Sequence, residues 1–501
     1  MKTILKIAFL SLLSSPLLAQ YDQDAFRLTS TTLSGNARFA SMGGAFGALG
    51  GNLSALSTNP ASIGIYRSGE LSFTPALTIG QTKTKIDGED KSRLGELWNF
   101  NLGNFGWVGV IDLSSSDAKD EWKKIQFGIG LNRKNDFWNR SQYSNHYSQQ
   151  SYLEILTLEA DSLGYTDDYY SGLAYDAGLI HGYYDYFEDE DGKIVDSMLR
   201  FGNYLNSPGG LTQDQVTKTT GGVNEWVFSM GGNYGDQLYV GATIGIPSLK
   251  YHQTKTLREG DAKNEHPGFW EKEWALREDL HLSGTGVNLK LGAIFKPADF
   301  IRIGLAFHTP TRFAIEERFS TEVEGNLEGK IERSKESISE YYVKTPARLI
   351  GSLGFVIGKV ALIGVEYEHV NYKHMWLDDE FGTFDADNDY ISEYYTKGGT
   401  LKIGAECRLE GISLRAGYNF SRNPYDESKM LTGGTDVATK ATFSQQALSA
   451  GIGFQLGRST TLDFAYVNSM RDYNEVPYAW QNINHYKTSE HQILVSLGFR
   501  F

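Results

Sequence analysis

Hydrophobic and polar residues alternate strictly along many stretches of the chain. In the segment 301–308, one face is apolar and consists of Ile301, Ile303, Leu305 and Phe307. The opposite face is charged or small and consists of Arg302, Gly304, Ala306 and His308. Segments 401–409 and 412–420 repeat this pattern. Because successive side chains of a strand point to opposite faces, a period of two predicts β-strands with one apolar face.

The length of these runs separates two kinds of β protein. Strands in soluble sandwiches are typically about 5 to 6 residues long. Here the alternating runs extend over roughly 10 to 16 residues, which suits tilted strands that cross about 25 Å of apolar bilayer. The pattern therefore predicts an all-β fold, a transmembrane antiparallel barrel, with its apolar face towards lipid.

About fourteen runs qualify as strands, an even number as bacterial barrels require. They lie at 70–83, 98–113, 121–137, 223–233, 236–253, 281–296, 299–319, 341–358, 359–373, 399–410, 411–423, 442–457, 458–471 and 488–501. Short links rich in turn-forming residues alternate with long polar links, the longest at about 138–222. This alternation is typical of periplasmic turns and extracellular loops, so both chain ends are predicted on the periplasmic side.

The first residues predict export. Lys2 and Lys6 precede an apolar run at 7–13, then Pro16 and a small residue at Ala19, as in a secretory signal peptide spanning 1–19. After it, no stretch approaches the roughly 18 consecutive apolar residues of a spanning helix. Together with the strand pattern, this predicts an integral protein of the outer membrane of a Gram-negative bacterium.

Composition narrows the partners. The chain has 55 glycines, 29 tyrosines and 27 phenylalanines, a net charge of −14 and a pI near 5.3. Glycine and aromatic residues in alternating runs suit a crowded barrel interior with aromatic rims, and the acidity argues against nucleic acid as a partner. Cys407 is the only cysteine, so we interpret it as a packing residue.

The residues between the signal peptide and the first strand form a different kind of segment. Segment 20–68 is rich in glycine and other small residues and shows no long alternation. It could form a periplasmic tail or short helical turns inside the lumen. Because a barrel of fourteen strands is wide enough to leak unless something fills it, we predict a plug, followed by the barrel proper at 69–501.

The motifs of this segment carry a resemblance. Gly43, Gly44 and Ala45, then Ser54 and Ala55, precede the tripeptide Asn59, Pro60 and Ala61 shortly before a strand begins. The arrangement resembles the N-terminal hatch of the outer-membrane transporter family of FadL and TodX, and segments 345–355 and 360–372 resemble its strands. The long loop at 138–222 departs from the family, so the family's exterior capture site is not transferred to this chain.

The resemblance implies a function. It implies passive uptake of small hydrophobic molecules such as long-chain fatty acids or aromatic compounds, through capture at the loops, a shift of the hatch and lateral exit through the wall. The six residues Gly43, Gly44, Ala45, Asn59, Pro60 and Ala61 would contact the lumen, with the tripeptide acting as a hinge.

Two further features concern the wall. Pro247 lies inside a predicted strand and removes one hydrogen bond from its ladder, so it marks either a wall kink or a position beyond the membrane. The chain ends in alternation, with Phe499 and Phe501 on the apolar face. This resembles the signal that the barrel-assembly machinery reads in outer-membrane proteins.

Other functional classes have weaker support. No HExxH or GxSxG motif is present, so an enzyme, a catalytic residue, a metal site or a cofactor is not predicted. The glycines of segment 43–51 do not follow a strand, as a phosphate-binding loop requires. Two acidic clusters are interpreted as solvated loop charge, with calcium as the alternative, and comprise Glu188, Asp189, Glu190, Asp191 and Asp385, Asp387, Asn388, Asp389.

One alternative function belongs to another class. The chain could be a subunit or docking platform of a larger outer-membrane assembly, such as secretion or barrel-insertion machinery. The long loops would then hold protein partners, whereas the transport hypothesis predicts a hydrophobic small molecule or lipid as the ligand. Both hypotheses keep outer-membrane lipids around the wall and the barrel-assembly machinery as a partner during biogenesis.

Overall fold

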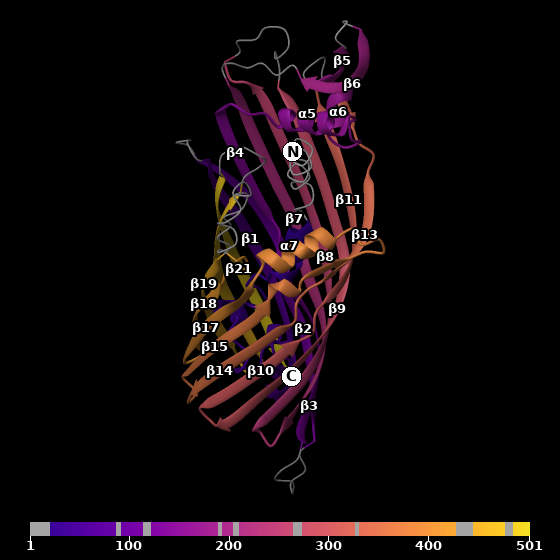
Figure 1. Cartoon of the computed structure of the whole chain (residues 1–501). Coiled ribbons are helices and arrows are strands. Elements are labelled where there is room, and N and C mark those ends of the chain that lie inside the picture. Colours follow the sequence, from indigo (N-terminus) through magenta and orange to yellow (C-terminus); the bar gives the residue numbers. More distant parts are fainter. Residues whose placement is uncertain are drawn as a thin grey trace.

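Neighbouring strands pair in antiparallel order, and the first strand also pairs with the last, which closes a barrel (Figure 1). The computed structural model describes residues 21–86, 92–113, 122–188, 193–203, 210–263, 273–325, 330–426, 444–475 and 484–501. The strands are β1 (Glu70–Ile86), β2 (Arg93–Asp112), β3 (Trp122–Asp136), β4 (Asn139–Ser148), β5 (Ile180–Glu188), β6 (Ile194–Asn203), β7 (Leu211–Tyr234), β8 (Leu238–Asp261), β9 (Trp274–Ala298), β10 (Ile301–His308), β11 (Arg312–Glu324), β12 (Ile331–Arg333), β13 (Ser337–Lys344), β14 (Arg348–Ile357), β15 (Ala361–Asn371), β16 (Trp376–Asp378), β17 (Lys397–Leu409), β18 (Ile412–Ser421), β19 (Gln445–Leu456), β20 (Thr460–Glu475) and β21 (Asn484–Arg500).

The helices are short and lie inside or above the barrel. They are α3 (Tyr21–Thr29), α4 (Ala37–Ser41), η1 (Ser54–Ser57), η2 (Pro60–Ile65), α5 (Tyr152–Leu163), α6 (Ser171–Asp176), η3 (Tyr372–His374) and α7 (Asp385–Tyr394). Among the described residues, no helix is long and apolar enough to cross a membrane.

The wall contains fourteen strands, as predicted, and some of them are broken. β10 and β11 continue one another across Pro310, and β13 and β14 continue one another across Pro346. Proline cannot donate a ladder hydrogen bond, which explains these two breaks. η3 separates β15 from β16, and β3 and β4 are separated at residues 137 and 138.

The long segment at 138–222 differs from the prediction. It was expected as a loop, but it contains β4, the helices α5 and α6, the hairpin of β5 and β6, and the first part of β7. β7, β8 and β9 reach 24, 24 and 25 residues. These strands are longer than a membrane crossing requires, so the barrel continues well beyond the apolar band on the side of the long links.

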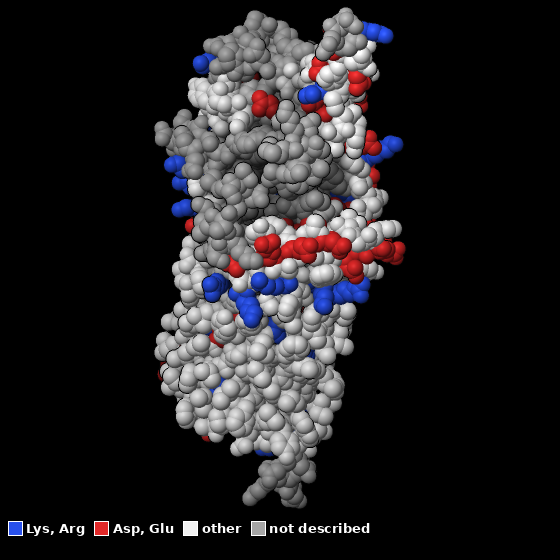
Figure 2. Space-filling model, in the orientation of Figure 1, with Lys and Arg blue, Asp and Glu red and all other residues white. Residues whose placement is uncertain are grey.

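The predicted faces of the strands are confirmed. Ile303, Leu305 and Phe307 are 45%, 57% and 43% exposed on the outer face, whereas Ala306 and His308 are buried in the interior. Figure 2 shows few charged side chains over the lower half of the visible face and a belt of Lys and Arg directly above it. The lower half therefore has the surface of a protein embedded in lipid.

The first and the last described residues lie at different heights in the barrel. Phe501 donates its backbone N–H to the Gly69 carbonyl, 3.1 Å away, next to the start of β1. Tyr21, the first described residue, lies in the lumen and packs against Phe384 beside α7. The prediction that both chain ends lie on the periplasmic side stays a prediction. The predicted signal peptide at 1–19 and the acidic residues Asp189, Glu190 and Asp191 lie outside the described residues.

Candidate functional site

The tripeptide Asn59, Pro60 and Ala61 lies on a row of glycines in the wall. Gly231, Gly241 and Gly292 are direct neighbours across β7, β8 and β9. A Cβ atom on Gly241 would overlap the Pro60 carbonyl, and one on Gly292 would lie 2.9 Å from the Ala61 nitrogen. The absence of side chains along this row therefore lets the hatch backbone lie directly on the barrel wall.

A second glycine row receives the other predicted hatch motif. Gly364, Gly404 and Gly417 are in register across β15, β17 and β18, and a Cβ on each would overlap the hatch backbone at residues 42–45. Gly43 and Gly44 adopt positive φ angles of 63° and 78°, which turn the chain after α4. Gly43 and Ala45 thus lie against the lumen wall, whereas a Cβ on Gly44 would meet Leu33 and Phe39 of the hatch itself.

Asn59 joins the two halves of the hatch. Its side chain is fully buried, and its Oδ1 accepts a hydrogen bond of 3.0 Å from the Ala61 N–H at the start of η2. Its Nδ2 donates to the carbonyl of Gly47 at 2.6 Å and to that of Ala293 in the wall at 3.4 Å. The hinge role that was predicted for this tripeptide stays a prediction.

Charged groups of the wall hold the hatch from the side. Arg38 of α4 donates to both carboxylate oxygens of Glu406, at 2.8 and 3.1 Å. Arg415 donates to Glu406 at 2.7 Å and to Asp463 at 2.6 Å. All four side chains are wholly or largely buried. Arginine and carboxylate pairs of this geometry are strong and directional, so they fix α4 against the wall.

The lumen beside the hatch is polar. A cavity of about 60 Å³ lies among residues that include Lys134, His308, Arg348, Glu368 and Lys402. Lys402 donates to Glu366 at 2.8 Å, and Arg348 forms an ion pair with Glu368. The cavity has room for several waters. An apolar solute would displace hydrogen bonds here without replacing them, so this path is unfavourable for it.

The upper lumen has the opposite character. α3 lies in an apolar chamber, and its Phe26 ring packs 5.9 Å from Tyr372 and 6.2 Å from Tyr395, measured between ring centroids. The chamber is lined mainly by apolar and aromatic residues of the wall and of α7: Val223, Leu249, Tyr251, Leu280, Leu282, Phe313, Tyr341, Tyr372, Phe384, Ile391, Tyr395 and Tyr425. This space is large enough to hold a helix and presents rings on several sides.

One buried carboxylate lies at the start of α3. Asp22 accepts a hydrogen bond of 2.8 Å from the Tyr395 hydroxyl, which also donates to Tyr425 or accepts from it at 2.9 Å. Burial raises the pKa of Asp22 from 3.8 to about 7, although the hydrogen bond from Tyr395 acts in the opposite direction. The seating of α3 in the chamber is thus sensitive to protonation.

The wall ladder is interrupted between β2 and β3. These strands pair only from Asn104 with Asn132 to Asp112 with Lys124. Above that level, residues 93–103 of β2 pair only with β1, while the chain continues into β4, which pairs with β7. On the outer face of this unpaired stretch, Trp98 and Phe100 are 57% and 76% exposed.

Polar side chains cross the interruption. Asp136, the last residue of β3, accepts hydrogen bonds from Asn99 at 3.1 Å and from Asn101 at 3.2 Å. Arg133 donates to the same carboxylate at 3.2 Å. Two amide side chains thus join β2 to the end of β3. β4 also packs against β2 here, because Gln142 donates to the Leu94 carbonyl at 2.8 Å and a Cβ on Gly95 would overlap the Arg140 carbonyl.

The hatch contacts the wall next to this interruption. A bulge shifts the register of β3 between Arg133 and Asn135. The Lys134 carbonyl accepts the Thr32 N–H at 3.0 Å, and Asn135 donates to the Ser30 hydroxyl at 3.1 Å. The segment that follows α3 is therefore bonded directly to the strand that separates from β2.

Pro247 interrupts a different ladder. It pairs with Glu225 on β7, but Ile246 and Pro247 have no partner on β9, where pairing stops at Gly245 and resumes at Ser248. The interruption between β2 and β3 is longer, and sequence reasoning missed it because it depends on which strand β4 joins.

The terminal residues Phe499 and Phe501 are exposed on the outer face, beside β1.

The acidic cluster at 385–389 has a structural role. Asn388 is buried and exchanges hydrogen bonds of 2.9 and 2.8 Å with the backbone of Leu377. Asp387 is also buried, and burial raises its pKa to about 6. The interpretation of these two residues as solvated loop charge was wrong, since α7 turns them towards the chamber.

Solved structures of hydrophobic-compound transporters have this architecture. A FadL homologue of Pseudomonas aeruginosa matches with a TM-score of 0.53 and 12% identity, over 94% of this chain and 100% of that chain. The toluene transporter TodX of P. putida matches with a TM-score of 0.54 and 12% identity, over 94% and 99%. The chain shares their fold. No protein-family model and no curated protein matches it.

Proposed function

We propose that the chain is an outer-membrane channel for the passive uptake of small hydrophobic molecules. The observation that carries this proposal is the aromatic chamber around α3, which lies in the upper lumen, apart from the polar, ion-paired lumen beside the hatch. Two similar structures are described as a toluene transporter and a monoaromatic hydrocarbon channel, which supports aromatic compounds as ligands, and long-chain fatty acids are the other class that we propose.

The chamber would be the capture site. α3 fills it with Phe26 and with the buried residues Ala25 and Leu28. A ligand of similar apolar surface would replace these contacts, because the gain from removing apolar area from water is not specific to one partner. Binding therefore competes with the seating of α3, and the shift of the hatch begins with this helix.

The exit would be lateral. An apolar solute below the chamber would meet the buried pairs of Lys402 with Glu366 and of Lys290 with Glu225. The interruption between β2 and β3 offers a shorter path into the bilayer, past Trp98 and Phe100. The hydrogen bonds of Ser30 and Thr32 to β3 would transmit the displacement of α3 to this part of the wall.

A reversible crosslink tests the hatch shift. Ser30 and Asn135 are replaced by cysteine in a Cys407→Ser background, since their side chains lie 3.1 Å apart. We expect the oxidised protein in liposomes to lose uptake of a fluorescent fatty acid and of toluene, and reduction to restore it. The control is a disulfide between Ser229→Cys and Thr243→Cys, two wall residues whose hydroxyls lie 2.7 Å apart. Equal uptake by the oxidised hatch crosslink and the control would reject the proposal.

The same proposal assigns the parts of the chain and their orientation. Residues 1–19 would be removed on export, 20–68 would form the hatch and 69–501 the barrel. The short links would face the periplasm and the long links the exterior. The barrel-assembly machinery would recognise the last strand through Phe499 and Phe501.

A further inference from the structure

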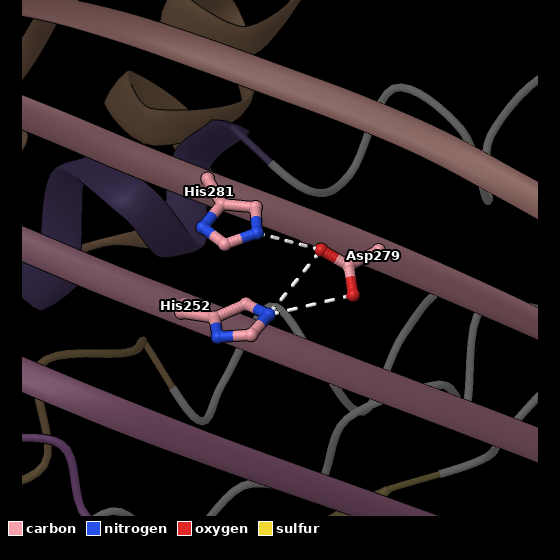
Figure 3. Close-up of side chains that lie close together, drawn as sticks. All are labelled: His252, Asp279 and His281. Atoms are coloured by element: carbon pink, nitrogen blue, oxygen red, sulfur yellow. Dashed lines mark hydrogen bonds and ion pairs between the residues drawn. The ribbon is translucent and has the colours of Figure 1, made fainter. Parts of the chain in front are cut away.

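Two histidines and an aspartate meet on the outer face of the wall, away from the lumen. Figure 3 shows the rings of His252 and His281 stacked on one another, each with a nitrogen directed at the carboxylate of Asp279. The Nε2 atoms lie 3.2 Å (His252) and 2.7 Å (His281) from Asp279 Oδ1. We propose that these three residues bind a divalent transition-metal ion of the class of Zn²⁺, Ni²⁺ and Cu²⁺.

The strand pairing prepares this arrangement. His252 of β8 and His281 of β9 are direct cross-strand partners, and Asp279 lies two residues before His281 on the same face. The two rings are 3.9 Å apart between centroids and inclined by 12°. Because the ladder on both sides of this pair is regular, the ligands need no backbone rearrangement to meet.

The distances suit shared coordination. With bonds of about 2.0 to 2.1 Å to nitrogen and oxygen, neighbouring ligand atoms of one ion lie roughly 3.0 to 3.4 Å apart. The observed separations of 3.2 and 2.7 Å are close to this range, and all the ligand atoms lie within 4.8 Å of one another. A small outward movement of Asp279 would admit the ion, which would replace two imidazole hydrogen bonds.

The second oxygen of the carboxylate is held by other residues. Asp279 Oδ2 accepts from Arg277 and from Thr254 at 3.4 Å each, and it also lies 3.4 Å from His252 Nε2. Outer-shell donors of this kind orient a ligating carboxylate and leave its other oxygen for the metal. Arg277 also forms an ion pair with this carboxylate at 3.4 Å, so a bound ion would share the negative charge of Asp279 with Arg277.

The donor set selects the kind of ion. Imidazole nitrogen suits Zn²⁺, Cu²⁺ and Ni²⁺, whereas Mg²⁺ and Ca²⁺ prefer oxygen ligands alone. Three protein ligands leave at least one position for water. The side chains of His252, His281 and Asp279 are 40%, 51% and 23% exposed, so an ion can enter from solvent.

The site lies outside the apolar band. Outward-facing side chains of β9 are apolar up to Val287, and those of β8 up to Ile246, six residues from His281 and His252 respectively. At about 3.3 Å per residue and a tilt near 40°, this places the ion roughly 15 Å beyond the hydrocarbon edge. There it would join β8 to β9 next to the interruption at Pro247.

Calorimetry and electron paramagnetic resonance test the site. The full chain in detergent is titrated with ZnCl₂, and we expect one tight site per chain and a higher temperature of thermal unfolding. Cu²⁺ should give a spectrum with splitting from two nitrogens. His252→Ala and His281→Ala should each weaken binding more than about tenfold, because loss of an outer-shell partner alone costs 10 to 100-fold. MgCl₂ and CaCl₂ should have no effect.

A matched variant separates this site from general surface binding. His374→Ala removes another exposed histidine, in η3, and should leave the affinity for Zn²⁺ unchanged. The electrophoretic shift of the folded barrel shows that each variant folds. Absence of Zn²⁺ binding below millimolar concentration, or unchanged binding in both His252→Ala and His281→Ala, would overturn the proposal.

Discussion

Gly241 shows how a single missing side chain positions the hatch. Its Cα faces Pro60 closely enough that a Cβ would overlap the Pro60 carbonyl. We expect Gly241→Leu to displace η2 at a cost of about 1 to 3 kcal/mol, as overpacked cores show, and to raise small-solute leakage in liposome swelling. Gly351→Leu is the control, because nothing lies within 4 Å of a Cβ at Gly351. Equal leakage from both variants would contradict the close packing of the hatch.

Asp22 makes the docking of α3 dependent on pH. Its pKa is raised from 3.8 to about 7, so the docked state favours the protonated carboxyl. The contribution of Asp22 to the stability of the docked helix is therefore complete below about pH 4. It falls as the pH rises to about 7, and at higher pH it stays constant. The change is at most about 4 kcal/mol.

Hydrogen exchange of the α3 amides checks this dependence. After correction for the intrinsic rates, protection should decrease from pH 4 to pH 7 in the native protein. Asp22→Asn should flatten the profile, apart from the smaller contribution of Asp387, whose pKa is raised to about 6 by burial. A profile that is the same in the native protein and in Asp22→Asn would assign the effect to other groups.

At the scale of elements, several separate contacts hold the hatch against the wall. α4, η1 and η2 are held by Arg38 with Glu406, by Ser57 with Asn132 and by the Asn59 contacts. Deletion of residues 20–61 would remove all of these at once and leave a lumen lined with charged groups. We expect small-solute leakage in liposome swelling to rise, because water would fill the freed space. Unchanged leakage would show that the barrel is closed without its hatch.

The elements differ in how well the sequence predicts them. The alternating pattern predicted the positions of the wall strands because one face of each strand points to lipid and the other to a polar lumen. Leu305 lies on the outer face and His308 on the inner face. The breaks at Pro310 and Pro346 were not predicted, since the alternating pattern continues on both sides of each proline. Local pattern also cannot show that β3 leaves β2, because the choice of partner is made by β4 and β7.

The candidate sites depend on contacts between distant parts of the chain. Phe26 meets Tyr395 and Tyr425, which follow it by more than half of the sequence. His252 and His281 come together only through the register of β8 and β9. The hatch motif could be recognised in the sequence because Asn59, Pro60 and Ala61 are contiguous and form the start of η2, where Asn59 is the N-cap.

At the scale of the whole molecule, the barrel has two surfaces with different surroundings. The outer face of β9 illustrates both of them, since Leu291 lies in the apolar band and Ser283 lies eight residues away in the polar region. Both side chains point outward from the same strand. They therefore differ in their position along the barrel axis, and neither of them contacts the lumen. On the face that Figure 2 shows, the lower half of the barrel carries few charged side chains, as a surface surrounded by lipid would.

An arginine at each position distinguishes these surroundings. Leu291→Arg should destabilise the folded barrel in lipid vesicles by about 2 to 4 kcal/mol, whereas an arginine near or beyond the interface costs only about 0 to 1 kcal/mol, which is the expectation for Ser283→Arg. Denaturant titration in vesicles measures both values. The difference should disappear in detergent of high charge, because the micelle adapts to the arginine. Equal values in vesicles would mean that the apolar outer face meets protein or water instead of lipid, and the proposed lateral exit would then have no bilayer to open into.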